Sequence, residues 1–393
     1  MVMLSAAKRL AGRDVPSSIH FMRMTWMILI AVGGSFLVSL AATYVVRAWA
    51  RRVGFVDRPG GHKRHNAPVA LGGGGAIVFA ICGPLLVGTL AAWFLRGGDA
   101  PIEGLPALVQ THLVGIASKL PTVMAITGGA AVLLIVGLID DRRPLGPMPK
   151  FLAQFAVAIC IAGPVGIRAV EALPAPLSIA LTVLWIIVIT NAFNFLDNMD
   201  GLSAGVAAIA AAIFAVTAAR SGQVFVPVMA WVVVGGLLGF LVFNFSPATI
   251  FMGDAGSLPL GFLMSVLTIL TIFYDPAKNL TPLGIIVPLV VLAVPLYDVI
   301  SVVIRRVRAG ESPLRGDWRH FSHRLVKRGM SPRGAVQTIY LATAATGLPA
   351  ILLPTVDWPI AILLLLQCLA VVTMIAILEH TSDPNPERQR RAD

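Results

Sequence analysis

The chain alternates between long runs of apolar residues and short polar segments, and this pattern dominates the sequence. About eleven runs come close to the roughly 20 residues that span the hydrocarbon core of a bilayer, and we expect each to form a transmembrane helix. The runs cover residues 25–48, 72–95, 121–139, 151–166, 177–195, 202–219, 225–245, 257–273, 283–303, 336–353 and 359–378. The predicted fold is therefore an all-α integral membrane protein, a polytopic bundle of about 10–11 transmembrane helices.

The connections between the runs are short and leave no room for a folded soluble domain. We expect one polytopic transmembrane domain over residues 25–378, an N-terminal extension over 1–24 and a polar C-terminal tail over 379–393. The composition agrees, because 57% of the residues are hydrophobic and only 12% are charged. Soluble domains usually carry roughly 25% charged residues.

The net charge of +11 would suggest a nucleic-acid partner in a soluble protein. In a membrane protein, however, Lys and Arg accumulate in cytoplasmic loops. With eleven crossings and the N-terminus outside, the connections on one side carry twenty Lys or Arg residues and those on the other side carry five. We therefore predict that the basic side faces the cytoplasm, and we expect no nucleic-acid partner.

Five acidic residues lie at the inner ends of the runs or just beyond them, on the basic side: Asp140, Asp141, Asp197, Asp200 and Asp254. The acids of the opposite side are scattered along the chain. A charged side chain in the bilayer centre costs about 2.5–3.5 kcal/mol on insertion scales, so such residues are usually paired or functional. The grouping predicts an active site at the cytoplasmic face.

Spacing suggests separate roles within this group. Asp140 and Asp141 are adjacent, so on a helix their side chains point about 100° apart and cannot readily chelate one ion together. Lys150 follows at the start of the next run, where its ammonium group can meet a phosphate as a point charge. Asp254, flanked by glycine and alanine, supplies a hard oxygen ligand for Mg²⁺ or Mn²⁺.

Polar residues recur at every third position in Asn191, Asn194, Asp197 and Asp200. On a straight helix these four positions fan over about 180°. Either the helix breaks near residues 198–201 or the four residues serve different ligands. Asn194 suits a metal through its amide oxygen, whereas Asp197 and Asp200 suit hydrogen-bond donors on a sugar or base.

Three further features each allow two interpretations. Phe251 either stacks on a nucleobase or anchors the chain at the membrane interface. The glycines of residues 72–75 permit either close helix packing or a backbone approach to a ligand. The basic loop over 304–335 either attracts anionic lipid headgroups or contributes His320 and His323 to the site.

Taken together, these motifs resemble the polyprenyl-phosphate N-acetylhexosamine-1-phosphate transferases of glycosyltransferase family 4, over about residues 56–328. The resemblance is closest to the bacterial undecaprenyl-phosphate GlcNAc-1-phosphate transferases. It implies transfer of a sugar-1-phosphate, GlcNAc-1-phosphate first of all, from a UDP-sugar to undecaprenyl or another polyprenyl phosphate. The products would be a lipid-linked diphosphate sugar and UMP, in the first membrane step of a cell-envelope glycan pathway. The enzyme would be Mg²⁺-dependent and would lie in the bacterial cytoplasmic membrane.

Carried over by position, the resemblance makes Asp140 and Asp141 the catalytic acidic pair and places Lys150 against the diphosphate. Asp254 and Asn194 would hold Mg²⁺, or Mn²⁺ in its place. The implied substrate-binding residues are Asn191, Asp197, Asp200, Phe251, His320, His323 and Arg324.

Several alternatives stay open in the sequence. The GlcNAc branch commonly has adjacent histidines where this chain has Ser322 and His323, so another UDP-N-acetylhexosamine remains a candidate donor. UDP-MurNAc-pentapeptide is a further candidate, although the loop lacks the triple histidine of the enzymes that use it. A transporter is a distant alternative, because the acids lie at one face and no repeat is visible. The oligomeric state, a homodimer included, is not fixed by the sequence.

Overall fold

The computed structural model describes residues 17–58, 67–96, 107–310 and 320–380. Within these residues every predicted run is helical, so the all-α membrane fold is confirmed. Strands are confined, in the described part, to β1 (Val56–Asp57) and β2 (Val69–Ala70), which pair antiparallel. The first 16 residues of the predicted N-terminal extension and residues 381–393 of the tail lie outside the described residues.

Eight helices among the described residues are long and apolar enough to cross a membrane. They are α2 (Ser17–Val53), α3 (Gly73–Leu95), α5 (Leu120–Arg142), α7 (Ala175–Leu196), α8 (Leu202–Arg220), α9 (Phe225–Asn244), α14 (Pro332–Ala350) and α15 (Trp358–His380). Three predicted crossings differ from a straight long helix. The run at 283–303 is bent by 64° between its first part and α12 (Ala293–Arg308). The other two are the shorter helices α6 (Pro147–Ala162) and α10 (Asp254–Leu270).

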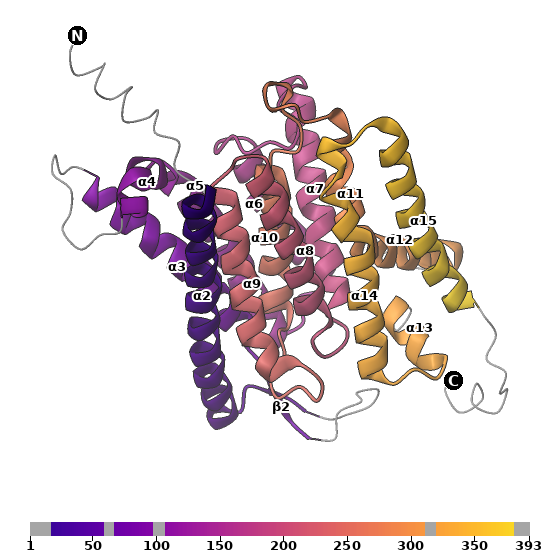
Figure 1. The fold of residues 1–393 in the computed structure, drawn as a ribbon. Coiled ribbons are helices and arrows are strands. Elements are labelled where there is room, and N and C mark those ends of the chain that lie inside the picture. The colour runs from indigo at the N-terminus through magenta and orange to yellow at the C-terminus, as the bar shows by residue number, and fades with distance from the viewer. Residues whose placement is uncertain (1–16, 59–66, 97–106, 311–319, 381–393) are drawn as a thin grey trace, which may run out of the picture.

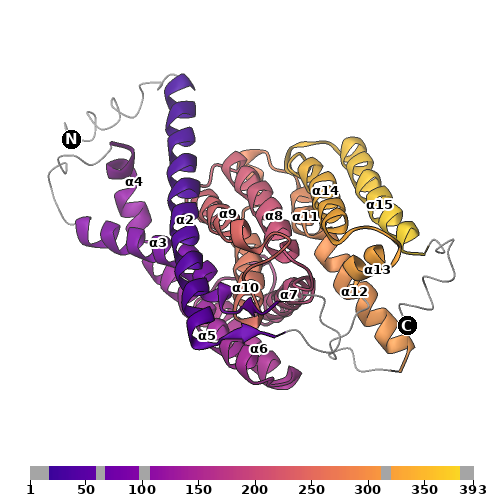
Figure 2. The ribbon, with the colours of Figure 1, turned by 90° about the horizontal axis from the view of Figure 1, so that it is seen from below.

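Several short helices complete the bundle. They are α4 (Ala107–Ala117), η1 (Pro276–Lys278), η2 (Pro282–Ile286), α11 (Val287–Val291), α13 (Phe321–Lys327) and η3 (Leu353–Thr355). Helix α4 was not predicted, because its apolar stretch is too short to span a bilayer. Helix α13 lies in the basic loop that the sequence marked as functional, at the same end of the bundle as β2 (Figure 1). Figure 2 shows this end from below, with α12 turned away from the bundle axis.

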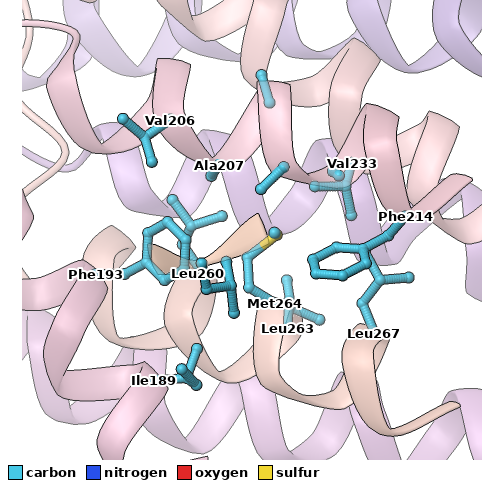
Figure 3. Close-up of a cluster of buried hydrophobic side chains, with 14 of the residues drawn as sticks. Ile189, Phe193, Val206, Ala207, Phe214, Val233, Leu260, Leu263, Met264 and Leu267 are labelled. Carbon is cyan, nitrogen blue, oxygen red and sulfur yellow. The ribbon is translucent and has the colours of Figure 1, made fainter. Parts of the chain in front are cut away.

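Helix α10 forms the centre of the bundle and thereby decides where its first residue, Asp254, lies. Nearly all its side chains are buried, and it packs against α3, α5, α7 and α8. In Figure 3, Leu260 lies beside Phe193 of α7, and Leu267 lies beside Phe214 of α8. Because lipid is as apolar as these side chains, close packing rather than transfer from water holds such helices together.

Two glycines bring α3 and α5 against the first turn of α10. A Cβ atom on Gly74 would lie 2.1 Å from the backbone nitrogen of Gly256, and one on Gly137 would lie 2.3 Å from that of Ala255. Any side chain at these positions would therefore push the three helices apart. Of the two interpretations of residues 72–75, the structure supports close packing.

The chain breaks between α7 and α8, which is one of the two alternatives that the three-residue spacing of polar groups left open. Helix α7 ends at Leu196 and α8 begins at Leu202, and Gly201 between them has a left-handed φ of 76°. The Gly201 N–H donates to Asn244 Oδ1 over 3.0 Å, and the Tyr340 hydroxyl donates to the Gly201 carbonyl. The turn is therefore anchored to α9 and α14, and the residues beside it are held at one end of the bundle.

Candidate active site

The first turn of α10 is capped by a carboxylate from α5. Asp141 Oδ1 accepts a hydrogen bond from the Asp254 N–H over 2.9 Å, and Oδ2 accepts one from the Ala255 N–H over 3.3 Å. A helix leaves its first N–H groups without partners, so a carboxylate there supplies both acceptors and a favourable charge. Asp141 thus fixes the position of Asp254.

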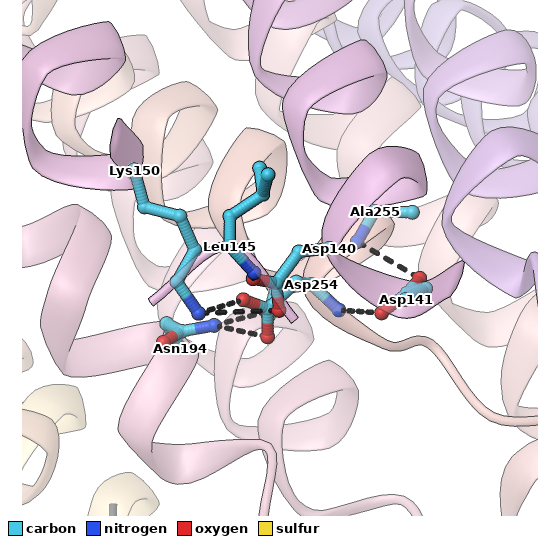
Figure 4. Close-up of polar contacts among 8 residues, drawn as sticks. Asp140, Asp141, Leu145, Lys150, Asn194, Asp254 and Ala255 are labelled. Carbon is cyan, nitrogen blue, oxygen red and sulfur yellow. Dashed lines mark hydrogen bonds and ion pairs between the residues drawn. The ribbon is translucent and has the colours of Figure 1, made fainter. Parts of the chain in front are cut away.

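Asp140 points elsewhere, as its 100° offset from Asp141 predicted, and joins a cluster around Lys150. The Lys150 Nζ atom lies 2.7 Å from Asp254 Oδ2 and 3.2 Å from Asp140 Oδ2 (Figure 4). Asp140 Oδ1 also accepts from the Leu145 N–H over 2.9 Å, which ties the carboxylate to the loop that leads into α6. Three helices therefore contribute one charged group each to the cluster.

Asn194 completes this cluster from α7. Its Nδ2 donates to Asp254 Oδ1 over 3.0 Å and to Ser257 Oγ over 2.8 Å. Asn191, one turn deeper, turns instead towards α6 and donates to Gln154 Oε1 over 2.6 Å. Of the two asparagines, the structure brings only Asn194 to the charged group.

A cavity of about 690 Å³ opens beside the cluster. Its walls come from the ends of helices and from loops at this end of the bundle. Four of the predicted substrate-binding residues line it: Asp197, Asp200, Phe251 and His323. Asp57 of β1 lines it too.

Asp197 is the most perturbed carboxyl group of the cavity wall. Burial raises the pKa of Asp197 well above its ordinary value, and the charges of Asp254, Asp141 and Asp200 raise this pKa further. A backbone hydrogen bond from Gly253 acts in the opposite direction but is weaker. Groups whose pKa is shifted by burial and neighbouring charge gather at functional sites.

Asp200 also has a structural partner. Its Oδ2 accepts a hydrogen bond from the Ala248 N–H over 2.9 Å, in the loop between α9 and α10. This bond connects the α7–α8 turn to the segment that carries Phe251. Asp200 therefore shapes the cavity as well as lining it.

The basic loop contributes its residues unequally. His320 Nδ1 lies 2.9 Å from Asp298 Oδ2, and the Arg324 Nη2 donates to Ser301 Oγ over 3.1 Å. Both partners belong to α12. His323, in contrast, lines the cavity. The loop is therefore not uniformly directed at the cavity.

Asp298 is a residue that the sequence reasoning missed. It lies inside the apolar run at 283–303, whereas attention went to acids at the ends of runs. A lone carboxylate within a run that is otherwise uncharged was the available signal, because an ionisable group inside a membrane segment needs a partner. Its partner on another element could not be read from spacing.

The charged cluster contains oxygen atoms of the kind that bind a divalent cation. Among the described residues no three His, Cys, Asp or Glu side chains form a ready-made metal cage. Mg²⁺ does not need one, since one or two carboxylates together with substrate phosphates and water complete its shell. Asp254 carries hard oxygen atoms that suit the ion. Asn194 reaches Asp254 Oδ1 over 3.0 Å through its Nδ2 donor, so it would offer its amide oxygen to an ion only after the amide group turns over.

Comparison with known proteins places this site within a family. The family model described as "Glycosyl transferase family 4" matches residues 123–272, which include α5 through α10. A probable undecaprenyl-phosphate N-acetylglucosaminyl 1-phosphate transferase of Bacillus subtilis is 34% identical over 83% of this chain and 85% of its own length. The decaprenyl-phosphate N-acetylglucosaminephosphotransferase of Mycolicibacterium smegmatis is 33% identical over 78% of this chain and 77% of its own length. The undecaprenyl-phosphate alpha-N-acetylglucosaminyl 1-phosphate transferase of Escherichia coli K12 is 26% identical over 79% of both chains. By this similarity over most of its length, the chain belongs to glycosyl transferase family 4, a family of membrane enzymes.

Proposed function

We propose that this enzyme transfers GlcNAc-1-phosphate from UDP-GlcNAc to undecaprenyl phosphate or another polyprenyl phosphate and releases UMP. The observation that carries the proposal is the cluster of Lys150, Asp140, Asp254 and Asn194 beside a 690 Å³ cavity, whose wall includes Gly253, the neighbour of Asp254 in the chain. The relatives named above are transferases of this kind. The same observations support a site at the cytoplasmic face of a bacterial membrane, because basic residues such as Arg142 and Arg305 end helices at this end of the bundle.

The reaction is a phosphoryl transfer. An oxygen of the lipid phosphate attacks the β-phosphorus of the UDP-sugar, and the bond between that phosphorus and the bridging oxygen breaks, so that UMP leaves with the electron pair. Positioning and charge neutralisation supply most of the catalysis in such reactions. Lys150 is placed to neutralise the diphosphate as charge moves to the leaving group.

Mg²⁺ held by Asp254 and Asn194 would add positive charge at the diphosphate, and Mn²⁺ is the alternative ion. Asp140 is less suited to act as a base. A phosphate monoester has a second pKa near 6 and is mostly dianionic at pH 7, so little proton removal is needed. Both Asp140 oxygens already accept hydrogen bonds, from Lys150 and from the Leu145 N–H. Its role is to orient Lys150.

The cavity suits the nucleotide end of the donor. Asp197 and Asp200 offer acceptors or, when protonated, donors for a ribose or base, and Phe251 adds an aromatic wall. His323 lies on the same cavity wall and is placed to contact the sugar end. Three of the predicted substrate-binding residues do not line the cavity: Asn191 contacts α6, and His320 and Arg324 contact α12.

The test is incubation of the purified enzyme with undecaprenyl phosphate and one nucleotide sugar at a time, followed by mass measurement of the lipid product. UDP-GlcNAc, UDP-GalNAc and UDP-MurNAc-pentapeptide form the panel, each with Mg²⁺, with Mn²⁺ and with EDTA. We expect a lipid-diphosphate GlcNAc and an equal amount of UMP only in the samples that contain metal. If no donor gives a lipid-diphosphate sugar, the proposed function is wrong.

A further inference from the structure

Helix α12 carries polar side chains on the face that meets α13. Asp298 and Ser301 lie three residues apart and therefore on one side of the helix. Asp298 is only 1% exposed. Burying a carboxylate without hydrogen-bond partners costs free energy, so the partners of Asp298 indicate its role in the structure.

Those partners are both at the start of α13. Asp298 Oδ1 accepts from the Phe321 N–H over 2.7 Å, and Oδ2 faces His320 Nδ1 over 2.9 Å. The first bond satisfies an N–H group that the helix itself leaves without an acceptor. The second fixes the direction of the imidazole ring. Because α13 has only seven residues, it depends on such external contacts to form at all.

His320 itself does not line the cavity, although its ring lies edge-on to that of His323 with centroids 6.5 Å apart. Its side chain is nearly buried and packs edge-on against Phe195, with ring centroids 5.6 Å apart. Three residues on, His323 lines the cavity, and between them Ser322 Oγ donates to Asn198 Oδ1 over 2.5 Å. The two histidines of the loop therefore occupy different surroundings, one against α7 and α12 and the other at the cavity.

We propose that Asp298 is a positioning residue for the donor site, acting through His320 and the Phe321 N–H to hold α13 so that His323 faces the cavity. In this arrangement His320 supports the position of α13, and His323 is the histidine that contacts the nucleotide sugar. The assignment of the ligand rests on the proposed function. The anchoring of α13 by Asp298 does not, so the two are tested separately.

The anchoring is tested by hydrogen exchange of the α13 amides in the variants Asp298→Ala and Asp298→Asn. Asp275→Asn is the matched control, because Asp275 also accepts from a backbone N–H and faces a cation, Lys278, but beyond the far end of α10. We expect faster exchange in α13 for Asp298→Ala, a smaller effect for Asp298→Asn, which keeps an acceptor for Phe321, and none for the control. Unchanged exchange in both Asp298 variants would overturn the anchoring.

The link to the donor is tested by steady-state kinetics. We expect Asp298→Ala to raise the KM for UDP-GlcNAc about tenfold, which is close to the lower value of a single hydrogen bond to a charged group, because the lost bonds act on the donor only through the position of α13. The KM for the lipid phosphate should stay within about twofold of wild type, since the proposal links Asp298 to the donor site alone. If Asp298→Ala yields too little folded enzyme, Asp298→Asn carries the same test with a smaller expected shift.

A double variant separates positioning from general destabilisation. If Asp298 acts through His323, then Asp298→Ala combined with His323→Ala should have the donor KM of His323→Ala alone, within about twofold. Multiplication of the two single effects would contradict the proposal. Absence of activity with every donor would refute the proposed function while leaving the exchange result intact.

Discussion

Replacement of Lys150 by Met removes the one ammonium group that joins Asp140 and Asp254, and its effect can be worked out from the structure. At an effective dielectric constant of 20, ion pairs at 2.7 and 3.2 Å are worth about 6 and about 5 kcal/mol before any cost is subtracted. Desolvation of the three groups cancels much of this attraction. Breaking a buried pair by removing one partner typically costs about 3–5 kcal/mol. Since these side chains are 15–23% exposed, the lower end applies, about 3 kcal/mol.

The catalytic effect should be separate and large. Loss of a donor placed where negative charge develops lowers kcat by about 10²–10³-fold. We therefore expect Lys150→Met to show both a lower thermal midpoint in detergent and a loss of UMP release of that size. The matched control is Lys278→Met, because Lys278 is 46% exposed and forms a looser pair, 3.7 Å from Asp275. Exposed pairs contribute at most about 1 kcal/mol, so this variant should behave like wild type.

A double variant checks the reasoning behind the stability estimate. Once Lys150 is Met, Asp140 and Asp254 face each other without a shared cation, so adding Asp140→Asn should recover part of the lost stability. No recovery would show that the ion-pair account is wrong. Activity of Lys150→Met within tenfold of wild type would refute the role of Lys150 in neutralising the diphosphate.

Three other predictions concern the surroundings of this cluster. Asp141→Ala removes the cap of α10 and should destabilise the enzyme by about 1–2 kcal/mol, measured as a lower thermal midpoint, with reduced activity because Asp254 shifts. Gly74→Ala should destabilise by about 1–3 kcal/mol by the same measure, since its Cβ would lie 2.1 Å from a backbone atom of α10; Gly75→Ala, whose Cβ meets nothing within 4 Å, is its control. The pKa of Asp197 is raised in the folded state, so folding favours the protonated form of this carboxyl group. Its contribution to stability is therefore present at low pH. That contribution is lost as the pH rises above the ordinary pKa of 3.8 and through the raised pKa. In EDTA, the thermal midpoint of the wild type should therefore fall with rising pH more steeply than that of Asp197→Asn; equal slopes would contradict this.

The fold was largely predictable because hydropathy reports directly on burial in lipid. Each of the eleven predicted runs is helical, and a break near residues 198–201 was one of the two alternatives that the three-residue spacing of polar groups allowed. The 64° bend before α12 was not visible, since a bent pair and a straight helix have the same hydropathy. Without the bend, the contact between Asp298 and His320 could not be foreseen.

The candidate site was predictable to a similar degree and for a related reason. Charged residues at the ends of different helices lie close together in space if those ends share one membrane face. Asp140 and Asp254 do lie close together, because both contact Lys150. The spacing also predicted correctly that the side chains of Asp140 and Asp141 point in different directions. The spacing could not indicate that Asn191 contacts Gln154. A residue's position on a helix gives the direction of its side chain, but it does not say which residue of a neighbouring helix lies in that direction.

The glycines show why packing and chemistry cannot be treated as separate features in this enzyme. From the sequence alone, residues 72–75 were equally compatible with helix packing and with contact to a ligand. In the structure Gly74 packs against the turn that begins with Asp254, which Asp141 caps from the other side. A side chain at Gly74 or Gly137 would displace that turn and with it the carboxylate that Lys150 contacts. Gly74 and Gly137 therefore govern the charged cluster through packing, because the position of that cluster is set by how closely three backbones approach.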